Sequence, residues 1–173
     1  MQNRHVITFI GDDRRGIVEH LADKIQSHDG NWLDSRLSQL EGKFAGLILV
    51  ELSDARSAAL EQALRELPGG DLSVRVTPAG EAPDETGLPL ALNLMGPDRP
   101  GIVREISSAL AAAGLNVLTM DSHVESAAFT GEPIFYATIS AIAAETLSIA
   151  ALKDKLDAIA ETMTVEIDID IDS

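Results

Sequence analysis

Apolar runs and amphipathic segments alternate along this chain in one order, and the order occurs twice. In the first half, the pattern predicts strands over residues 4–10, 31–40, 44–52 and 72–76, with helices running to about residue 28 and over 55–67. In the second half, it predicts strands ending at 95 and over 116–125, 133–142 and 165–172, with helices over 100–113 and 147–162. Each half therefore follows the order β-α-β-β-α-β. That order predicts an α+β fold of two tandem ferredoxin-like units, each an antiparallel sheet with both helices on one face.

The spacing within these elements also predicts which side chains are buried. In the first helix, one face at helical spacing collects five apolar residues: Ile17, Val18, Leu21, Ala22 and Ile25. The strand over residues 4–10 is almost continuously apolar, which predicts burial on both of its faces. The last strand alternates aliphatic residues with acids, so one of its faces is expected to be a solvated row of carboxylates that discourages edge pairing.

A loop motif recurs between the first strand and first helix of each half. The two copies are Gly11-Asp12-Asp13-Arg14-Arg15-Gly16-Ile17-Val18 and Gly96-Pro97-Asp98-Arg99-Pro100-Gly101-Ile102-Val103, displaced by 96 − 11 = 85 positions. Each following helix ends at a glycine, and the next strand carries an asparagine near its start, Asn31 or Asn116. The repeat predicts two domains, residues 1–78 and 88–173, joined over 79–87 by a polar linker that contains proline and glycine.

Composition narrows the functional classes. The net charge is −15, of which residues 1–87 contribute 9 − 15 = −6 and residues 88–173 contribute 4 − 13 = −9. Lysine and arginine contacts to phosphate supply much of nucleic-acid affinity, so this balance opposes direct DNA binding. There is no cysteine, and the four histidines show no metal-ligand spacing, so no metal site or cofactor is expected. No nucleophile–base arrangement supports an enzyme. Without a signal peptide or a membrane-length apolar run, the chain is expected to be cytoplasmic.

The repeated loop suits a small carboxylate better than a phosphate. Neither copy has the Gly-x-Gly-x-x-Gly spacing or a lysine followed by serine or threonine, and both contain acids that repel phosphate. A helix N-terminus with an adjacent glycine presents backbone N–H groups to an anion, while aspartate and asparagine offer partners for an ammonium group. A zwitterionic amino acid needs both kinds of partner, donors for its carboxylate and acceptors for its ammonium group. The alternative is equally open: Asp13 and Asp98 serve only as turn residues, and Pro100 only sets the backbone for the helix.

The motif Asp-Arg-Pro-Gly-Ile-Val, followed by a helix ending in glycine and an Asn-Val-Leu strand, resembles the ACT domain, a ligand-sensing ferredoxin-like module. The resemblance covers nearly the whole chain, twice. Two such units without a catalytic domain resemble the glycine-cleavage-system transcriptional repressor family. That resemblance implies a small amino-acid ligand, glycine first, and action through a partner transcription regulator. It also implies a ligand held between two units by the loop and the asparagine-bearing strand.

Carried over by position, the resemblance implicates nine residues: Asp98, Arg99, Gly101, Ile102 and Asn116, with Asp13, Arg14, Gly16 and Asn31 as their first-unit counterparts. Arg15 replaces the proline found at Pro100, so the first loop is expected to bind more weakly than the second. The rival hypothesis is a structural pair of domains that dimerises and binds nothing small. A homo-oligomer is compatible with either hypothesis.

Overall fold

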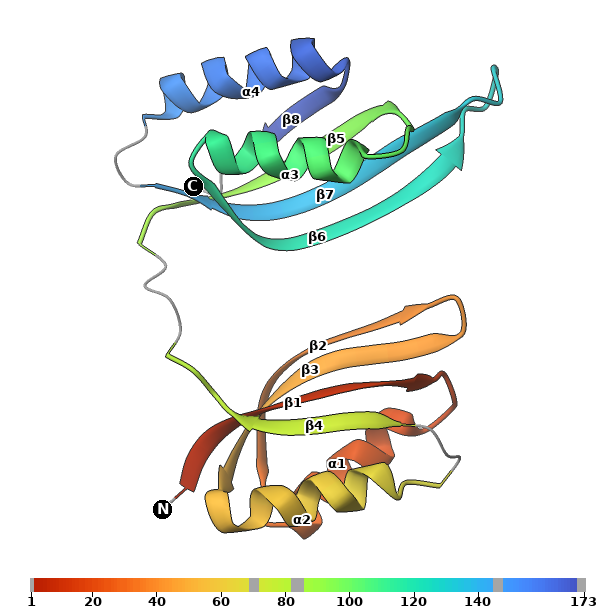
Figure 1. The fold of residues 1–173 in the computed structure, drawn as a ribbon, viewed down its shortest axis with the longest axis vertical. Coiled ribbons are helices and arrows are strands. Elements are labelled where there is room, and N and C mark those ends of the chain that lie inside the picture. Colours follow the sequence, from red (N-terminus) through yellow and green to blue (C-terminus); the bar gives the residue numbers. More distant parts are fainter. Residues whose placement is uncertain (1, 69–71, 82–85, 145–147, 171–173) are drawn as a thin grey trace. The chain divides into compact units, whose positions relative to one another are not determined.

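Two β-α-β-β-α-β units follow one another along the chain (Figure 1). The computed structural model describes residues 2–68, 72–81, 86–144 and 148–170. It divides into a unit over Met1–Glu81 and a unit over Ala82–Ser173, and the division falls inside the predicted linker. The α+β, ferredoxin-like architecture predicted from the sequence is confirmed for both units.

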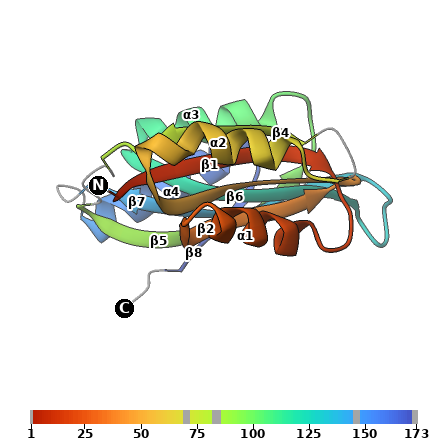
Figure 2. The same ribbon diagram turned by 90° about the horizontal axis from the view of Figure 1, so that it is seen from below.

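The first unit is an antiparallel sheet with two helices on one face (Figures 1 and 2). Its elements are β1 (Gln2–Asp12), α1 (Ile17–Ser27), β2 (Asn31–Leu40), β3 (Lys43–Ser53), α2 (Asp54–Arg65) and β4 (Ser73–Pro78). The strand order is β2-β3-β1-β4, so β1 is central and its end directs the chain into α1. The other face of this sheet carries no helix.

The core of the first unit lies between the helices and one face of the sheet. Ile7 of β1, Leu21 of α1 and Leu60 of α2 are fully buried there. Two burial predictions are wrong. Helices cover only one face of the sheet, so β1 alternates and Ile10 is 50% exposed. The buried face of α1 is narrower than predicted: Ile17, Leu21 and Ile25 are buried, whereas Val18 is 41% exposed.

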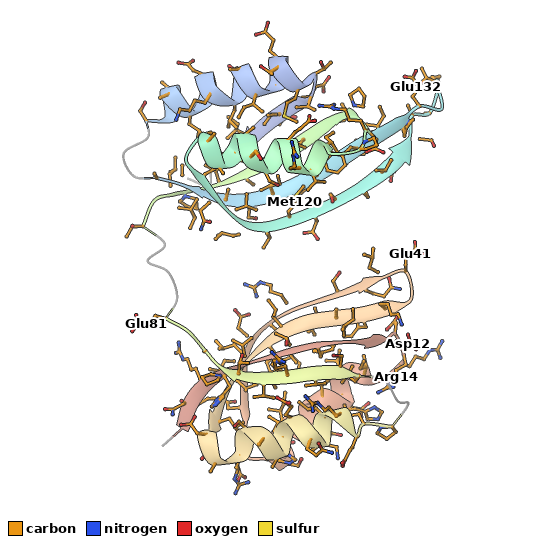
Figure 3. The ribbon with its side chains drawn as sticks, in the orientation of Figure 1. Asp12, Arg14, Glu41, Glu81, Met120 and Glu132 are labelled. Atoms are coloured by element: carbon orange, nitrogen blue, oxygen red, sulfur yellow. The ribbon has the colours of Figure 1, made fainter. Side chains whose placement is uncertain are left out.

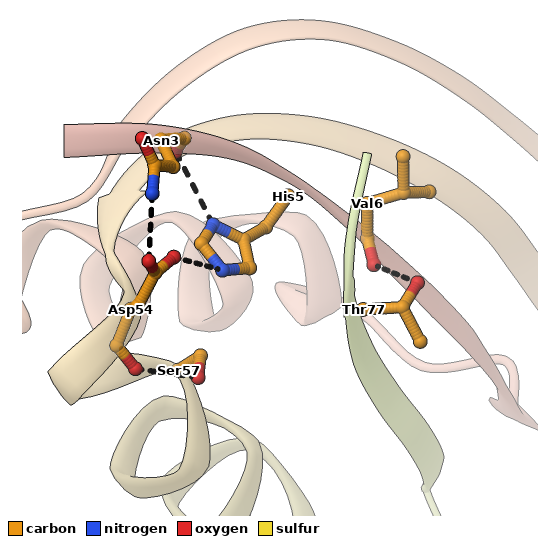
Figure 4. A network of polar contacts seen from close by, with 6 residues as sticks. All are labelled: Asn3, His5, Val6, Asp54, Ser57 and Thr77. Carbon is orange, nitrogen blue, oxygen red and sulfur yellow. Dashed lines mark hydrogen bonds and ion pairs between the residues drawn. The ribbon is translucent and has the colours of Figure 1, made fainter. Parts of the chain in front are cut away.

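A polar contact joins the start of β1 to the start of α2 (Figure 4). The His5 ring is almost fully buried, and its Nε2 atom lies 3.2 Å from Oδ1 of Asp54. Its Nδ1 atom lies 3.2 Å from the carbonyl oxygen of Asn3, and the Asn3 side chain donates to Oδ2 of Asp54 at 2.6 Å. One exposed carboxylate therefore supplies the partner of a buried ring nitrogen.

The second unit repeats the topology with the order β6-β7-β5-β8. Its elements are β5 (Leu88–Pro97), α3 (Ile102–Ala112), β6 (Leu115–Ser126), β7 (Pro133–Ala143), α4 (Ile149–Met163) and β8 (Glu166–Asp170). The predicted helix start at residue 147 and the predicted strand end at 171–172 lie outside the described residues. On the edge strand β8, Ile167 and Ile169 pack against the core, whereas the alternating acids are exposed, as the sequence pattern predicts.

No described helix has the length and apolar character needed to cross a membrane. Within the described ranges, no group of three or more histidine, aspartate or glutamate side chains is arranged to hold a metal ion.

Candidate functional site

The two strand–helix loops share one backbone geometry. Gly16 and Gly101 immediately precede α1 and α3 with φ of 81° and 92°, a left-handed conformation that favours glycine. The amide of Asp13 donates to the carbonyl of Gly42 at 2.8 Å, and the amide of Asp98 donates to that of Pro133 at 3.0 Å. Each loop is thereby fixed to the hairpin that connects the second and third strands of its unit.

The conformation, more than the space, is what requires glycine at these two positions. A Cβ atom on Gly16 would approach only side-chain atoms, the nearest being Oε2 of Glu19 at 3.7 Å and Cε1 of His20 at 3.9 Å. A Cβ atom on Gly101 would lie 3.9 Å from Oε1 of Glu105. In both units, therefore, the side chain four residues after the glycine folds back over the loop.

The charges of the two loops differ even though their backbones agree. In the second unit, Nη2 of Arg99 donates to Oε2 of Glu105 at 2.7 Å and to the carbonyl oxygen of Met163 at 3.4 Å. Subtracting 85 from each number gives Arg14 and His20 in the first unit. There, Nε and Nη2 of Arg14 and Nδ1 of His20 are buried and have no hydrogen-bond partner among the described residues.

Asp12 lies at the end of β1, close to Arg14 of the first loop (Figure 3), and forms an exposed ion pair. Lys43 contacts Oδ1 of Asp12, and this hydrogen bond and charge hold the pKa of the Asp12 carboxyl below its ordinary value. The charge of Arg14 adds a smaller effect in the same direction. Asp12 is thus already engaged by Lys43, and no carboxylate within the described part of the chain lies at ion-pair distance from Arg14.

Within one unit, the structure does not bring the loop and the asparagine together. On β7, Asn116 pairs with Ile142, whereas the amide of Asp98 bonds to Pro133, nine residues away and about 30 Å along the strand. The helix runs back along the sheet before the second strand begins, so that strand starts at the far end. The expectation that Asp98 and Asn116 of one unit reach the same ammonium group is therefore corrected.

The first unit has the same separation. Asn31 pairs with Glu51 and Asp12 with Lys43, at opposite ends of β3. Within a single unit, the loop and the asparagine therefore do not form one site. Ile102 is buried in the core at 3% exposure, so its side chain positions the helix start and does not face solvent.

A mainly apolar hollow of about 720 Å³ lies next to the second loop. Its walls come from the end of β5 (Met95, Gly96 and Pro97), from the β6–β7 connection and from the C-terminal end of α4 with Glu161. None of the nine residues implicated from the sequence lines it. Sequence spacing did not predict this hollow, because the segments that line it are brought together only by long-range contacts.

Comparison with known proteins decides the family. A family model described as ACT domain matches residues 3–76, and a second model with the same description matches residues 91–161. The chain is a tandem of two ACT domains. Among curated proteins, this tandem ACT chain is similar to the UPF0237 protein MJ1558 of Methanocaldococcus jannaschii, with 34% identity over 76 residues, 43% of this chain and 83% of that protein.

Two solved structures match the tandem over its whole length. One is an unknown protein from Galdieria sulphuraria, with 24% identity, a TM-score of 0.86 and 100% of both chains covered. The other is a putative glycine cleavage system transcriptional repressor, with 19% identity, a TM-score of 0.76, and 100% of this chain and 99% of that chain covered. At these identities, the similarity shows a shared fold.

Proposed function

We propose that this tandem ACT protein is an amino-acid-responsive regulator that acts on a partner protein and not directly on DNA. The observation that carries the proposal is that two ACT domains account for residues 3–76 and 91–161, and that both carry the Asp-Arg-x-Gly loop at a helix start. We assign no catalytic step to these domains. The candidate ligand-binding residues are the two loops and the asparagines named above.

The charge of the chain supports the choice of partner. A net charge of −15 opposes association with a phosphate backbone, whereas it does not oppose contact with another protein. Glycine is put forward as the first amino acid to test, because a full-length structural relative is described as a putative repressor of the glycine cleavage system. The partner proposed is a transcription regulator.

Thermal unfolding of the full chain in the presence of each common amino acid tests the ligand proposal. A ligand that binds the native state at a hundred times its Kd stabilises it by about 2.7 kcal/mol, so a true ligand raises the unfolding temperature in a concentration-dependent way. We expect glycine or another small amino acid to do so. If none does, the domains form a structural module without a small ligand, and the proposal fails.

A further inference from the structure

We infer that the β6–β7 connection of the second unit and the apolar hollow next to it form the surface on which a partner protein docks. The docking segment of that partner is apolar and carries lysine or arginine. This inference deepens the proposed function, on which it rests for the existence of a partner. The connection, residues 127–132, extends beyond the end of β5, where Pro97 pairs with Ile134 (Figure 1).

Phe129, in this connection, is fully exposed to solvent. A phenylalanine ring gains free energy when a partner removes it from water, and aromatic side chains are enriched in the cores of protein interfaces. Two backbone hydrogen bonds hold the connection that presents the ring. The amide of Ala127 donates to the carbonyl of Glu132 at 2.8 Å, and the amide of Gly131 donates to the carbonyl of Ala127 at 2.9 Å. Such preorganisation lowers the entropy cost of docking.

The hollow supplies a concave apolar surface next to the exposed ring. Ala127 and Ala128 of the connection line it, together with Ile134 and Tyr136 of β7, and its volume is about 720 Å³. The Tyr136 ring stacks on His123, with ring centroids 5.2 Å apart and an interplanar angle of 13°, so this part of the wall has a fixed orientation. An exposed aromatic side chain beside a concave apolar surface is typical of a protein interaction site.

Carboxylates around the hollow determine the charge of the partner. Glu161 and Glu166 line it, and Glu132 lies at the end of the connection (Figure 3). Among the described residues, none of these three side chains forms an ion pair, and no lysine or arginine lines the hollow. A partner that covers this surface therefore gains from positive charge placed beside its apolar anchor.

The same charges oppose a second copy of this chain as the occupant. Phe129 of another copy would supply an apolar anchor, but residues 124–135 around it contain two glutamates and no lysine or arginine. Residues 88–173 as a whole carry 4 lysine and arginine residues against 13 acids, so two such surfaces repel one another. The observations therefore favour a different protein with a basic segment.

Three synthetic peptides of equal length separate apolar burial from charge. The first combines leucine and lysine at helical spacing, the second has glutamate in place of every lysine, and the third has serine in place of every leucine. Each carries a fluorescent label, and the full chain is titrated into it at physiological ionic strength while anisotropy is followed. We expect the leucine–lysine peptide to bind saturably, one per chain. The serine–lysine peptide should bind at least tenfold more weakly, and the leucine–glutamate peptide should not bind.

Phe129→Ala tests the anchor. It should weaken binding of the leucine–lysine peptide at least tenfold, as expected for a central interface residue, and leave the unfolding temperature unchanged because the ring is exposed. Leu40→Ala is the matched control, since Leu40 is 75% exposed and lies next to the corresponding hairpin turn of the first unit. This variant should bind the peptide as the native chain does.

The double variant Glu161→Gln, Glu166→Gln tests the charge of the hollow. It should weaken binding of the leucine–lysine peptide roughly fivefold and reduce the dependence of this binding on salt. The double variant Glu19→Gln, Asp23→Asn removes the same charge from exposed positions of α1 and is the matched control. It should bind the peptide within about twofold of the native chain.

Four results would overturn the inference: peptide binding unaffected by Phe129→Ala, binding of the glutamate or serine peptide as tight as that of the leucine–lysine peptide, self-association of the native chain that Phe129→Ala abolishes, or saturation of the Tyr136 ring signals by phenethylamine when no peptide binds. The last two would assign the surface to a second copy or to a small ligand.

The fates of this inference and of the proposed function are separable. If an amino acid stabilises the chain but no peptide binds at Phe129, the docking surface fails and amino-acid sensing stands. If the leucine–lysine peptide binds as expected while no amino acid stabilises the chain, the docking surface stands and amino-acid sensing fails.

Discussion

Replacing Asp54 by alanine should destabilise the first ACT domain specifically. The substitution removes the partner of Nε2 of His5, whose side chain is only 2% exposed, so that nitrogen becomes an unsatisfied buried group at a cost of about 1–3 kcal/mol. It also removes an acid from the first turn of α2, which contributes roughly 0.3–1 kcal/mol. The lost bond from Asn3 adds little, because its donor is exposed and water replaces the carboxylate.

The sum is about 2 kcal/mol, which corresponds to roughly 8–16 °C in the unfolding temperature of a domain of this size. Urea unfolding followed by tryptophan fluorescence measures it directly. The chain has one tryptophan, Trp32, and it packs partly buried against the core of the first unit, so its signal reports on that unit. Asp54→Asn is the matched control, since it keeps an oxygen that faces His5 and should cost less.

A double-mutant cycle with His5→Leu isolates the contact. Asp54→Ala should cost at least about 1 kcal/mol less in the His5→Leu background than in the native one, because the buried nitrogen is then absent. An Asp54→Ala cost below roughly 0.5 kcal/mol, or the same cost in both backgrounds, would refute the reasoning.

Three further predictions follow from local contacts and charge. Lys43→Met should raise the pKa of Asp12 toward its ordinary value in a carboxyl NMR titration. In the native protein, the ion pair stabilises the folded state at pH values above the ordinary aspartate pKa, and this contribution is lost as the pH falls through the lowered pKa of Asp12. Gly46→Ala should destabilise the first domain by about 1–3 kcal/mol in urea unfolding, because its Cβ would lie 2.6 Å from the carbonyl oxygen of Arg36. Gly80→Ala, with nothing within 4 Å, is its control and should be nearly neutral. Finally, fluorescence anisotropy should find no nanomolar, salt-sensitive binding of the isolated protein to duplex DNA, given its charge of −15.

The fold followed from the sequence because local period and global topology agree in this chain. Strict alternation in β8 predicted its buried and exposed faces, and the 85-position repeat predicted two equivalent units. The errors arose where burial depends on what covers an element. Ile10 and Val18 are as apolar as their buried neighbours. Ile10 is exposed because it lies on the sheet face without helices, and Val18 is exposed because it lies outside the buried stripe of α1.

The candidate site was less predictable. The separation of Asn116 from Asp98 could have been predicted from the sequence. The eleven-residue helix between them carries the chain about 16 Å back along the sheet. The exchange of Glu105 for His20 was also visible in the aligned repeat. The consequence of that exchange was not visible, because spacing alone does not say whether an arginine side chain is buried, or whether a glutamate in the first turn of the following helix reaches it.

In the second domain, the carboxylate of Glu105 competes with any free carboxylate for the guanidinium of Arg99. Glu105 is a carboxylate tethered to the loop that it neutralises, and a group on a short tether acts at an effective concentration on the order of millimolar or above. A free carboxylate must exceed that concentration to displace it. A free carboxylate at Arg99 therefore competes with a counter-ion that cannot diffuse away, whereas no described carboxylate lies at ion-pair distance from Arg14 in the first domain.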